Sequence, residues 1–359
     1  MPTNTYYIDV AVGNDVNLGT SEGVGNAWAS IGHAMDTVAA DDLVYVKASG
    51  DYIAQDGATG AIGQIDTAGG AATPIVFEGY TTTPGDGTFA CVTLDAGTNA
   101  LANCINSNLG SVALYYTFRN FRFTGGSSHG VDLTDEDNVF FSRCRFDNNG
   151  SNGILGDNLY VFSLCQADNN SLSGMELGIA GYYCSLVSFS NTSFGLNQTG
   201  TVGVLYNCIL YENRRDQVSF GGEAFILNST IDGNNSTELG IDGIRALSIV
   251  ANTILYDCST GIDGNPGSED LCVSLHNLFH SNTADVANWP TDPSDIIADP
   301  LFVNAAANDY RLSDASPARQ AGIDAGEVVN GASYVDVGAQ QSIAFHRITI
   351  NNNTFGLEP

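Results

Sequence analysis

The sequence predicts an all-β protein, a right-handed single-stranded parallel β-helix in which each coil supplies three short strands. The first observation is a repeat that begins near Phe118 and ends near Asn282, with apolar anchors 21 to 25 residues apart. Internal repeats of this length are typical of solenoids, propellers and arrays. The second observation is that apolar residues alternate with period two, which favours strands over helices. The third is that Asn and Gly end the segments, and both adopt left-handed turn conformations at low cost.

The N-terminal part, residues 1–52, is predicted to start the solenoid and to cap it. Residues 6–10 read as a first strand and residues 42–46 begin the next one. Between them, apolar side chains recur at helical spacing, at Trp28, Ile31, Ala34, Met35 and Val38. We expect a short amphipathic helix that covers the open end of the solenoid, where strand edges would otherwise lack partners.

The coils are assigned to residues 53–285. The early coils are irregular, with loops at 56–70 and 81–87 and strands at 75–78 and 91–94. The anchors of the regular coils are Phe118, Phe141, Phe162, Tyr183, Leu205, Ile226, Val250 and Leu275. Polar residues mark a first turn at Asn120, Asn207, Asn228, Asn252 and Asn277, and a second turn at Asn148, Asn169, Asn191, Asn213, Asn234, Asp257 and Asn282. We expect the Asn side chains to stack and to cap backbone groups, which is a structural role.

The C-terminal part is predicted to close the solenoid over residues 286–342. Pro and Gly turns and the apolar segments near Phe302, Tyr310 and Val337 should supply a final strand and a cover for the last coil. Residues 343–359 form a tail in which apolar and polar residues alternate from Ile343 to Thr349. Such a strand could pair with another subunit or fold back on the solenoid.

These features resemble the pectate-lyase-like superfamily of parallel β-helices, found in phage virion proteins and in extracellular polysaccharide-active proteins. The segment YYIDVAVGNDVNLGT near the N-terminus and the closing series from Asp299 to Ala339 are similar to the two ends of such chains. The resemblance implies the fold, whereas function depends on the site, because one scaffold hosts many activities. The paired aspartates, Gly-His-Gly and Arg-x-Lys of polygalacturonases and the Arg-x-Pro-x-x-Arg of pectate lyases are missing; Ser128-His129-Gly130 is the nearest remnant.

Composition narrows the classes of function. The formal net charge is −29 with only 11 basic residues, which argues against nucleic-acid binding because phosphate contacts need a basic face. An acidic surface suits solubility, divalent cations or saline water. No run of 18 apolar residues predicts a membrane span, and Met1-Pro2-Thr3-Asn4 shows no signal peptide. Cys144, Cys165 and Cys208 share one inward position, so we expect buried free thiols and assembly in a reducing cytoplasm.

Candidate catalytic residues lie on the strand that follows each Gly, where alternate side chains point outward. On this register the outward carboxylates are Asp132, Glu176, Asp242 and Asp263. The first two are two coils apart, about 9–10 Å at the usual strand spacing, which is near the separation of an inverting glycosidase pair. The last two are on successive coils, about 5 Å apart, closer to a retaining pair. In a chain with 40 acidic residues, such pairs also arise as ordinary surface carboxylates.

Candidate substrate-binding residues are Arg122 and Arg145 on adjacent coils and the neighbours Arg214 and Arg215. Paired arginines can bind a carboxylate or sulfate through two parallel hydrogen bonds. The alternative is a surface ion pair with a nearby Asp or Glu. The histidines predict no metal site, whereas the turn at residues 135–138, with sequence Asp-Glu-Asp-Asn, could hold Ca²⁺ or be a solvated loop.

The sequence favours the first of three functions, because known catalytic motifs and a signal peptide are missing and the thiols are expected to be buried and free. The first is a structural or receptor-facing bacteriophage virion component, such as a head decoration, fibre or spike, made in the host cytoplasm. It is not catalytic, and it contacts other virion proteins or itself through the tail. The second is an extracellular polysaccharide lyase or glycoside hydrolase that acts on an acidic glycan. The third is a bacterial surface adhesin. A groove over Asp132 and Glu176, or over Asp242 and Asp263, would favour chemistry, whereas a flat stripe would favour a scaffold.

Overall fold

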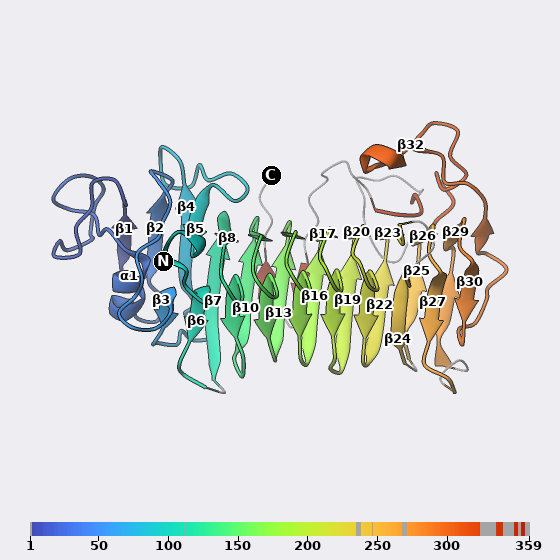
Figure 1. Cartoon of the computed structure of the whole chain (residues 1–359), viewed down its shortest axis with the longest axis horizontal. Helices are drawn as coiled ribbons and strands as arrows, with labels where there is room; N and C mark the ends of the chain where they lie inside the picture. The colour runs from blue at the N-terminus through green and yellow to red at the C-terminus, as the bar shows by residue number, and fades with distance from the viewer. Residues whose placement is uncertain are drawn as a thin grey trace.

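The chain folds, in a computed structural model, as a right-handed parallel β-helix whose three long sheets run along its axis (Figure 1). The structure describes residues 2–110, 112–234, 238–245, 247–267, 271–323, 335–339, 348–350 and 353–355, without the side chains of Leu159 and of the last two segments. From β4 to β30 each coil contributes one strand to each sheet, and neighbouring strands in a sheet pair in parallel. The predicted fold class is therefore confirmed.

The three sheets are named here A, B and C. Sheet A contains β1 (Thr5–Ile8), β2 (Leu43–Lys47), β4 (Ile75–Tyr80), β7 (Ala113–Arg119), β10 (Asp137–Ser142), β13 (Leu159–Ser163), β16 (Ala180–Cys184), β19 (Val202–Tyr206), β22 (Glu223–Leu227), β25 (Ile249–Ala251) and β28 (Val273–Leu275). Sheet B contains β5 (Val92–Asp95), β8 (Phe121–Thr124), β11 (Arg145–Asp147), β14 (Gln166–Asp168), β17 (Val187–Phe189), β20 (Ile209–Tyr211), β23 (Thr230–Asp232), β26 (Ile254–Tyr256), β29 (Leu278–His280) and β31 (Ile296–Ile297). Sheet C contains β3 (Ala61–Ile65), β6 (Asn103–Ser107), β9 (Val131–Leu133), β12 (Ile154–Gly156), β15 (Met175–Leu177), β18 (Leu196–Gln198), β21 (Val218–Phe220), β24 (Ile241–Ile244), β27 (Thr260–Gly264) and β30 (Ala284–Ala287).

The core is a column of stacked side chains on the inner face of sheet A. The rings of Phe77, Phe118, Phe141, Phe162 and Tyr183 stack in that order, with neighbouring centroids 5.4 to 5.7 Å apart. The same register continues through the predicted anchors as far as Val250. The last anchor was predicted one residue too late, because Val250 pairs with Ser274 and not with Leu275. The turn explains this shift, since His276 takes the left-handed conformation that Asn252 takes one coil earlier.

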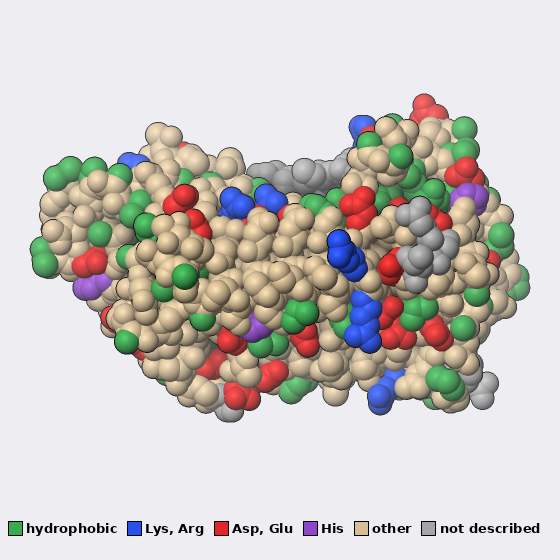
Figure 2. Space-filling view, in the orientation of Figure 1, with side chains coloured by type: hydrophobic (Ala, Val, Ile, Leu, Met, Phe, Trp, Pro, Cys, Tyr) green, Lys and Arg blue, Asp and Glu red, His purple; other side chains and the backbone are tan. Residues whose placement is uncertain are grey.

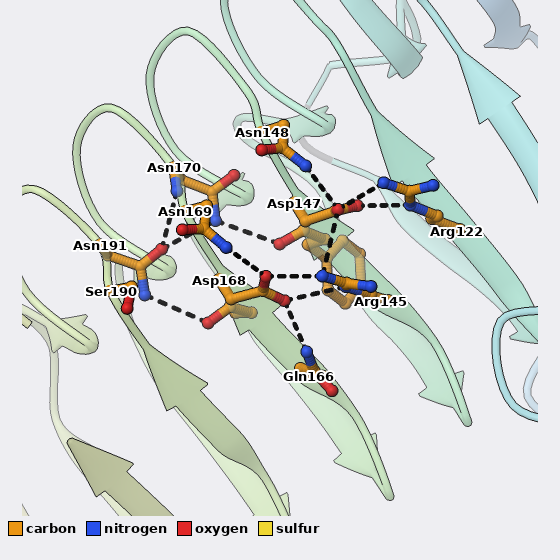
Figure 3. A network of polar contacts seen from close by, with 12 residues as sticks. Arg122, Arg145, Asp147, Asn148, Gln166, Asp168, Asn169, Asn170, Ser190 and Asn191 are labelled. Carbon is orange, nitrogen blue, oxygen red and sulfur yellow. Dashed lines mark hydrogen bonds and ion pairs between the residues drawn. The ribbon is translucent and has the colours of Figure 1, made fainter. Parts of the chain in front are cut away.

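The turn between sheets B and C contains two neighbouring columns of polar residues, which were predicted as a single column. Asn148, Asn169, Ser190 and Glu212 have positive φ and reverse the chain. The next residue in each coil is an inward-facing Asn, and these side chains form a ladder. Amide nitrogens donate to the amide oxygen of the following coil, from Asn149 to Asn170 (3.0 Å), Asn170 to Asn191 (2.9 Å) and Asn191 to Asn213 (2.9 Å). The predicted structural role of these residues is confirmed, and Figure 3 shows part of the ladder.

The N-terminal helix α1 (Ile31–Thr37) covers the first coils as predicted. Ser30 caps it by accepting a hydrogen bond from the His33 backbone N–H at 3.2 Å. Ile31 and Met35 pack against Gly63 of β3. That strand lies inside residues 56–70, which were predicted as a loop, so this prediction was wrong. Gly63 occupies an inward position of its sheet, and Ile62 on the opposite side of the strand is also buried. Because both sides are buried, the strand lacks the alternation of polar and apolar residues by which it could be recognised.

The C-terminal segment closes the solenoid from two directions. Trp289 is buried beneath the last coil and contacts Gly264 of β27. The chain then runs back over the outer face of sheet B, with the antiparallel strands β32 (Phe302–Asn304) and β33 (Asp309–Leu312), so that Ile254 and Leu278 are buried there. This lateral cover was not predicted. In the tail, β34 (Ile348–Ile350) and β35 (Asn353–Phe355) pair with each other, and the remainder of residues 343–359 lies outside the described residues.

The other short elements are the 3₁₀ helices η1 (Gly97–Asn99) and η3 (Ala305–Ala307). Among the described residues, none of the helices has the length and apolar character needed to cross a bilayer. Cys144, Cys165 and Cys208 are buried thiols, as predicted. Burial raises the pKa of the Cys208 thiol to about 12, so this group stays protonated.

A buried carboxyl group under the C-terminal cover provides a test of this packing. Asp232 accepts hydrogen bonds from the Tyr310 hydroxyl (3.0 Å) and from the Asn234 backbone N–H (2.9 Å). Burial, with a smaller contribution from Asp257, raises the pKa of Asp232 to about 6. Because the folded pKa lies above the unfolded value, Asp232 contributes stability below about pH 4, and that stability is lost as the pH rises through 6.

Asp232→Asn is therefore expected to raise the free energy of unfolding at pH 7 by about 1–3 kcal/mol, because the uncharged amide oxygen still accepts from the Asn234 N–H and the amide nitrogen can donate to the Tyr310 hydroxyl. The gain should vanish at pH 4. Urea denaturation at both pH values measures it. Asp309→Asn is the matched control. Because Arg311 lowers the pKa of Asp309, removing the negative charge of Asp309 should not raise the free energy of unfolding at pH 7. A loss of stability in Asp232→Asn at pH 7 would contradict the prediction.

Candidate functional site

The outer face of sheet C carries a single column of outward side chains. Strand register places Asp132, Leu155, Glu176, Asn197, Ser219, Asp242 and Asp263 next to one another in this order. All are half-buried. The structure thus brings the four predicted carboxylates to one face, with the spacing that the sequence indicated. Six strand spacings separate the two ends of the column, about 29 Å.

A groove lies over the end of this column that contains Asp242 and Asp263. Its volume is about 440 Å³, and its lining includes Asn197, Ser219, Asp242, Arg245, Asp263, Asn265 and Asn288. A β-bulge follows Asp242, where Gly243 has a φ of 77° and the strand register shifts. A Cβ at Gly243 would lie 2.7 Å from the backbone oxygen of Phe220. The bulge therefore requires glycine, and bulges of this kind re-aim side chains beside active sites.

The two carboxylates in the groove have different surroundings. Asp263 accepts a hydrogen bond from the Asn288 side-chain amide at 3.2 Å. Burial raises the pKa of Asp242, the negative charge of Asp263 raises it further, and Arg215 opposes both effects. Adjacent register places the two residues about 5 Å apart. When two neighbouring carboxyl groups have different surroundings, their pKa values move apart, and one group can then act as an acid while the other acts as a base.

Asp216 and Arg215 lie at the edge of the same cluster. Burial and the charge of Asp242 raise the pKa of Asp216 to about 6. The Arg215 guanidinium is 3.9 Å from the Asp216 carboxylate and lies over the Phe194 ring, 4.4 Å from its centroid. Arg214 is exposed, and its backbone N–H donates to the Asn191 carbonyl. In Figure 2, basic and acidic side chains lie next to one another in the region where Figure 1 labels β22 and β24.

The other predicted pair, Asp132 and Glu176, lies beside His129. The backbone N–H of Asn152 donates to His129 Nδ1 at 3.3 Å, which places the proton of the neutral ring on Nε2. Burial lowers the pKa of His129, and the charges of Asp132 and Glu176 raise it. The Ser173 hydroxyl donates to Glu176 at 3.4 Å, and the Thr134 hydroxyl donates to Asp132 at 2.8 Å. This cluster shares the face of sheet C with the groove. Glu176 lies one coil from Asn197, which lines the groove, and three coils from Asp242.

Arg122 and Arg145 are on sheet B, away from the groove, and they form a ladder with two buried aspartates (Figure 3). Arg122 binds Asp147 through two hydrogen bonds of 2.8 and 2.6 Å. Arg145 binds Asp168 in the same way, at 2.9 and 2.7 Å, and its guanidinium is also 3.4 Å from Asp147. These contacts are the ion-pair alternative that the sequence left open. A substrate-binding role for the two arginines remains a prediction.

The turn at residues 135–138 holds its carboxylates in different ways. Glu136 is buried, and one of its oxygens accepts hydrogen bonds from the Ser107 hydroxyl and the Gly110 N–H, both at 2.8 Å. Its other oxygen and one oxygen of Asp137 have no hydrogen-bond partner among the described residues. The part of the chain that the structure describes contains no group of three or more His, Cys, Asp or Glu arranged for a metal ion. Binding of Ca²⁺ at this turn therefore stays a prediction.

The charged and amide residues in or beside the groove that the sequence did not predict are Asn197, Asp216, Arg245, Asn265 and Asn288. Arg245 lines it from the segment that follows the bulge, Asn288 reaches Asp263 from beyond β30, and Asp216 lies at its edge. Asp216 could have been recognised in the sequence, because it lies three residues before the outward position of its strand, as His129 lies three residues before Asp132. Arg245 and Asn288 belong to loops whose course is set by the bulge at Gly243 and by the packing of Trp289, and neither shows in the repeat.

Comparisons with known proteins identify the fold class. No protein-family model matches the sequence, and no curated protein sequence matches it significantly. Among solved structures, the chain is similar to pectate lyase Pel9A, with a TM-score of 0.56 and 16% identity over 95% of this chain and 96% of that one. It is also similar to a rhamnogalacturonan lyase (TM-score 0.50, 16% identity, 78% and 74% covered) and to XylC in complex with xylose (0.50, 9%, 83% and 87%). The protein thus has the pectate-lyase-like right-handed β-helix fold.

Proposed function

We propose that the protein is a polysaccharide-cleaving enzyme whose active site is the groove over Asp242 and Asp263. The observation that carries the proposal is the pair of carboxylates on adjacent strands inside a groove, one with a raised pKa and the other bound by Asn288. Similar structures include two polysaccharide lyases. That similarity supports the enzyme over the virion component, for which no comparison gives support.

The geometry favours hydrolysis with Asp242 as the general acid and Asp263 as the nucleophile. Asp242 gives its proton to the glycosidic oxygen while a carboxylate oxygen of Asp263 forms a bond to the anomeric carbon and the leaving sugar departs. Water, deprotonated by Asp242, then displaces Asp263 and restores both groups. The strand spacing of about 5 Å between the two residues is compatible with the carboxyl separation of this retaining route. Arg245 in the groove and Arg215 at its edge supply cations for an acidic sugar, so the proposed substrate is an acidic glycan.

A lyase is the second candidate, and the similarity to pectate lyase Pel9A over nearly the whole chain favours it. A lyase abstracts a proton beside the carboxylate of a uronate and leaves an unsaturated end, whereas a hydrolase adds water. The two reactions therefore differ in their products, and the products decide between them.

The test is incubation of the purified protein with uronate-containing and neutral polysaccharides, with and without Ca²⁺. The expected result is new reducing ends without unsaturated ends, together with a preference for an acidic glycan. Equal numbers of reducing and unsaturated ends would establish the lyase instead. If no polysaccharide in the panel is shortened, the proposed enzyme function is wrong.

A further inference from the structure

A second pocket lies on another face of the solenoid, where the turns between sheets A and B meet the loop that joins β4 to β5. Its volume is about 480 Å³, and it is lined by Gly87, Thr88, Phe89, Arg143, Leu164, Cys165, Gln166, Ser185 and Val187. The loop is anchored to the coils, because the Ala90 N–H donates to the Arg143 carbonyl at 3.0 Å. Gly87 packs so closely against Gly79 and Asn120 that no side chain fits at that position.

The turn residues under this loop depart from the pattern of the repeat. Each turn between sheets A and B needs one residue with positive φ, and four coils place Asn there, at Asn120, Asn207, Asn228 and Asn252. Three consecutive coils place Arg143, Leu164 and Ser185 at this position instead, with φ of 54° to 55°. Arg and Leu are disfavoured in this conformation, whereas Asn adopts it readily. These are the three turn residues that line the pocket.

The charge of Arg143 is unusual in so acidic a protein. Although the chain has 40 acidic residues, no carboxylate of the described residues lies within ion-pair distance of the Arg143 guanidinium. Asp86, which precedes Gly87 in the loop, accepts hydrogen bonds from the backbone N–H groups of Thr81, Thr82 and Thr83. The pocket thus combines one cation with the apolar side chains of Phe89, Leu164 and Val187. Phe89, which lines the pocket, is 44% exposed.

We infer that this pocket binds an organic carboxylate with an apolar face. The carboxylate pairs with the Arg143 guanidinium, and the ring or chain of the ligand lies against Phe89, Leu164 and Val187. The backbone disadvantage at residues 143 and 164 is retained because these side chains form the ligand site, as strained positions often do. The inference is independent of the groove over Asp242 and Asp263, which lies on sheet C.

Binding can be measured calorimetrically with benzoate and glucuronate, which carry a carboxylate on an aromatic ring and on a sugar ring. Benzyl alcohol and glucose are the neutral counterparts. At least one carboxylate is expected to bind ten times more tightly than its neutral counterpart, and the one that does identifies the ring that the pocket accepts. If neither carboxylate is preferred, or if no compound binds, the inference is wrong.

Arg143→Asn separates ligand binding from folding. Asn suits the left-handed turn, so the variant should melt at the same temperature as the parent protein or higher, while its preference for the carboxylate disappears. Arg311→Asn changes the net charge equally, at an exposed arginine of β33, and should leave carboxylate binding unchanged. Carboxylate binding that survives in Arg143→Asn, or that is lost equally in Arg311→Asn, would overturn the assignment.

Discussion

Arg145→Met is expected to lower the free energy of unfolding by about 3–5 kcal/mol, because it leaves buried carboxylates without their cation. The Arg145 guanidinium binds Asp168 through two hydrogen bonds and also contacts Asp147, and both aspartates are 0% exposed. Gln166 and Asn169 still donate to Asp168, at 2.7 Å each, but they do not neutralise its charge. Urea denaturation at neutral pH measures the loss.

The chain contains a matched control for this variant. Arg311 binds Asp309 through the same two kinds of hydrogen bond, at 2.8 and 2.6 Å, but the Arg311 side chain is 63% exposed and that of Asp309 is 25% exposed. Arg311→Met should therefore change the free energy of unfolding far less than Arg145→Met does. Equal losses in the two variants would show that burial of Asp147 and Asp168 does not determine the effect.

The regular coils could be predicted from the sequence because every coil repeats the same physical requirement. An inward ring such as Phe141 must stack on the ring of the next coil, and a residue such as Asn228 must reverse the chain, so both recur at fixed intervals. The prediction was wrong where another part of the chain, and not solvent, covers a strand or a turn. In β3 the residues on both sides of the strand are buried, so no alternation of polar and apolar residues marks it. At the last coil, His276 takes the place of Asn and shifts the register by one residue.

The candidate site was predictable only as far as the repeat defines it. Alternation placed Asp242 and Asp263 on the outer face of sheet C, and the register confirms their adjacency. Their groove depends on the bulge at Gly243 and on Arg245, which no periodic pattern specifies. Conversely, Arg122 and Arg145 stack as the sequence predicts, but only the packing shows that the carboxylates they bind are buried.

Asp263→Asn is expected to reduce kcat/KM for polysaccharide cleavage by about 10²–10⁴-fold or more, since the amide cannot form the bond to the anomeric carbon. Asp242→Asn should cause a loss of similar size, because the leaving sugar then receives no proton. Initial rates of reducing-end release measure both effects. Asp132→Asn makes the same chemical change on the same column, outside the groove, and should alter the rate by much less. If it is as damaging as the other two, the reaction takes place beside His129 and not in the groove.

The separate roles of Asp242 and Asp263 can be assigned with a substrate that has an activated leaving group and by the dependence of the rate on pH. A glycoside whose leaving group departs without protonation should restore bond cleavage in Asp242→Asn but not in Asp263→Asn, because only the general acid becomes unnecessary. In the parent protein the rate should fall as the pH rises through the raised pKa of Asp242, since the acid form is then lost. Asp242→Asn should lack this decrease. If the leaving group rescues Asp263→Asn instead, the roles are reversed. That result would mean that the raised pKa of Asp242, which comes from its burial and from the negative charge of Asp263, does not determine which carboxyl group acts as the general acid.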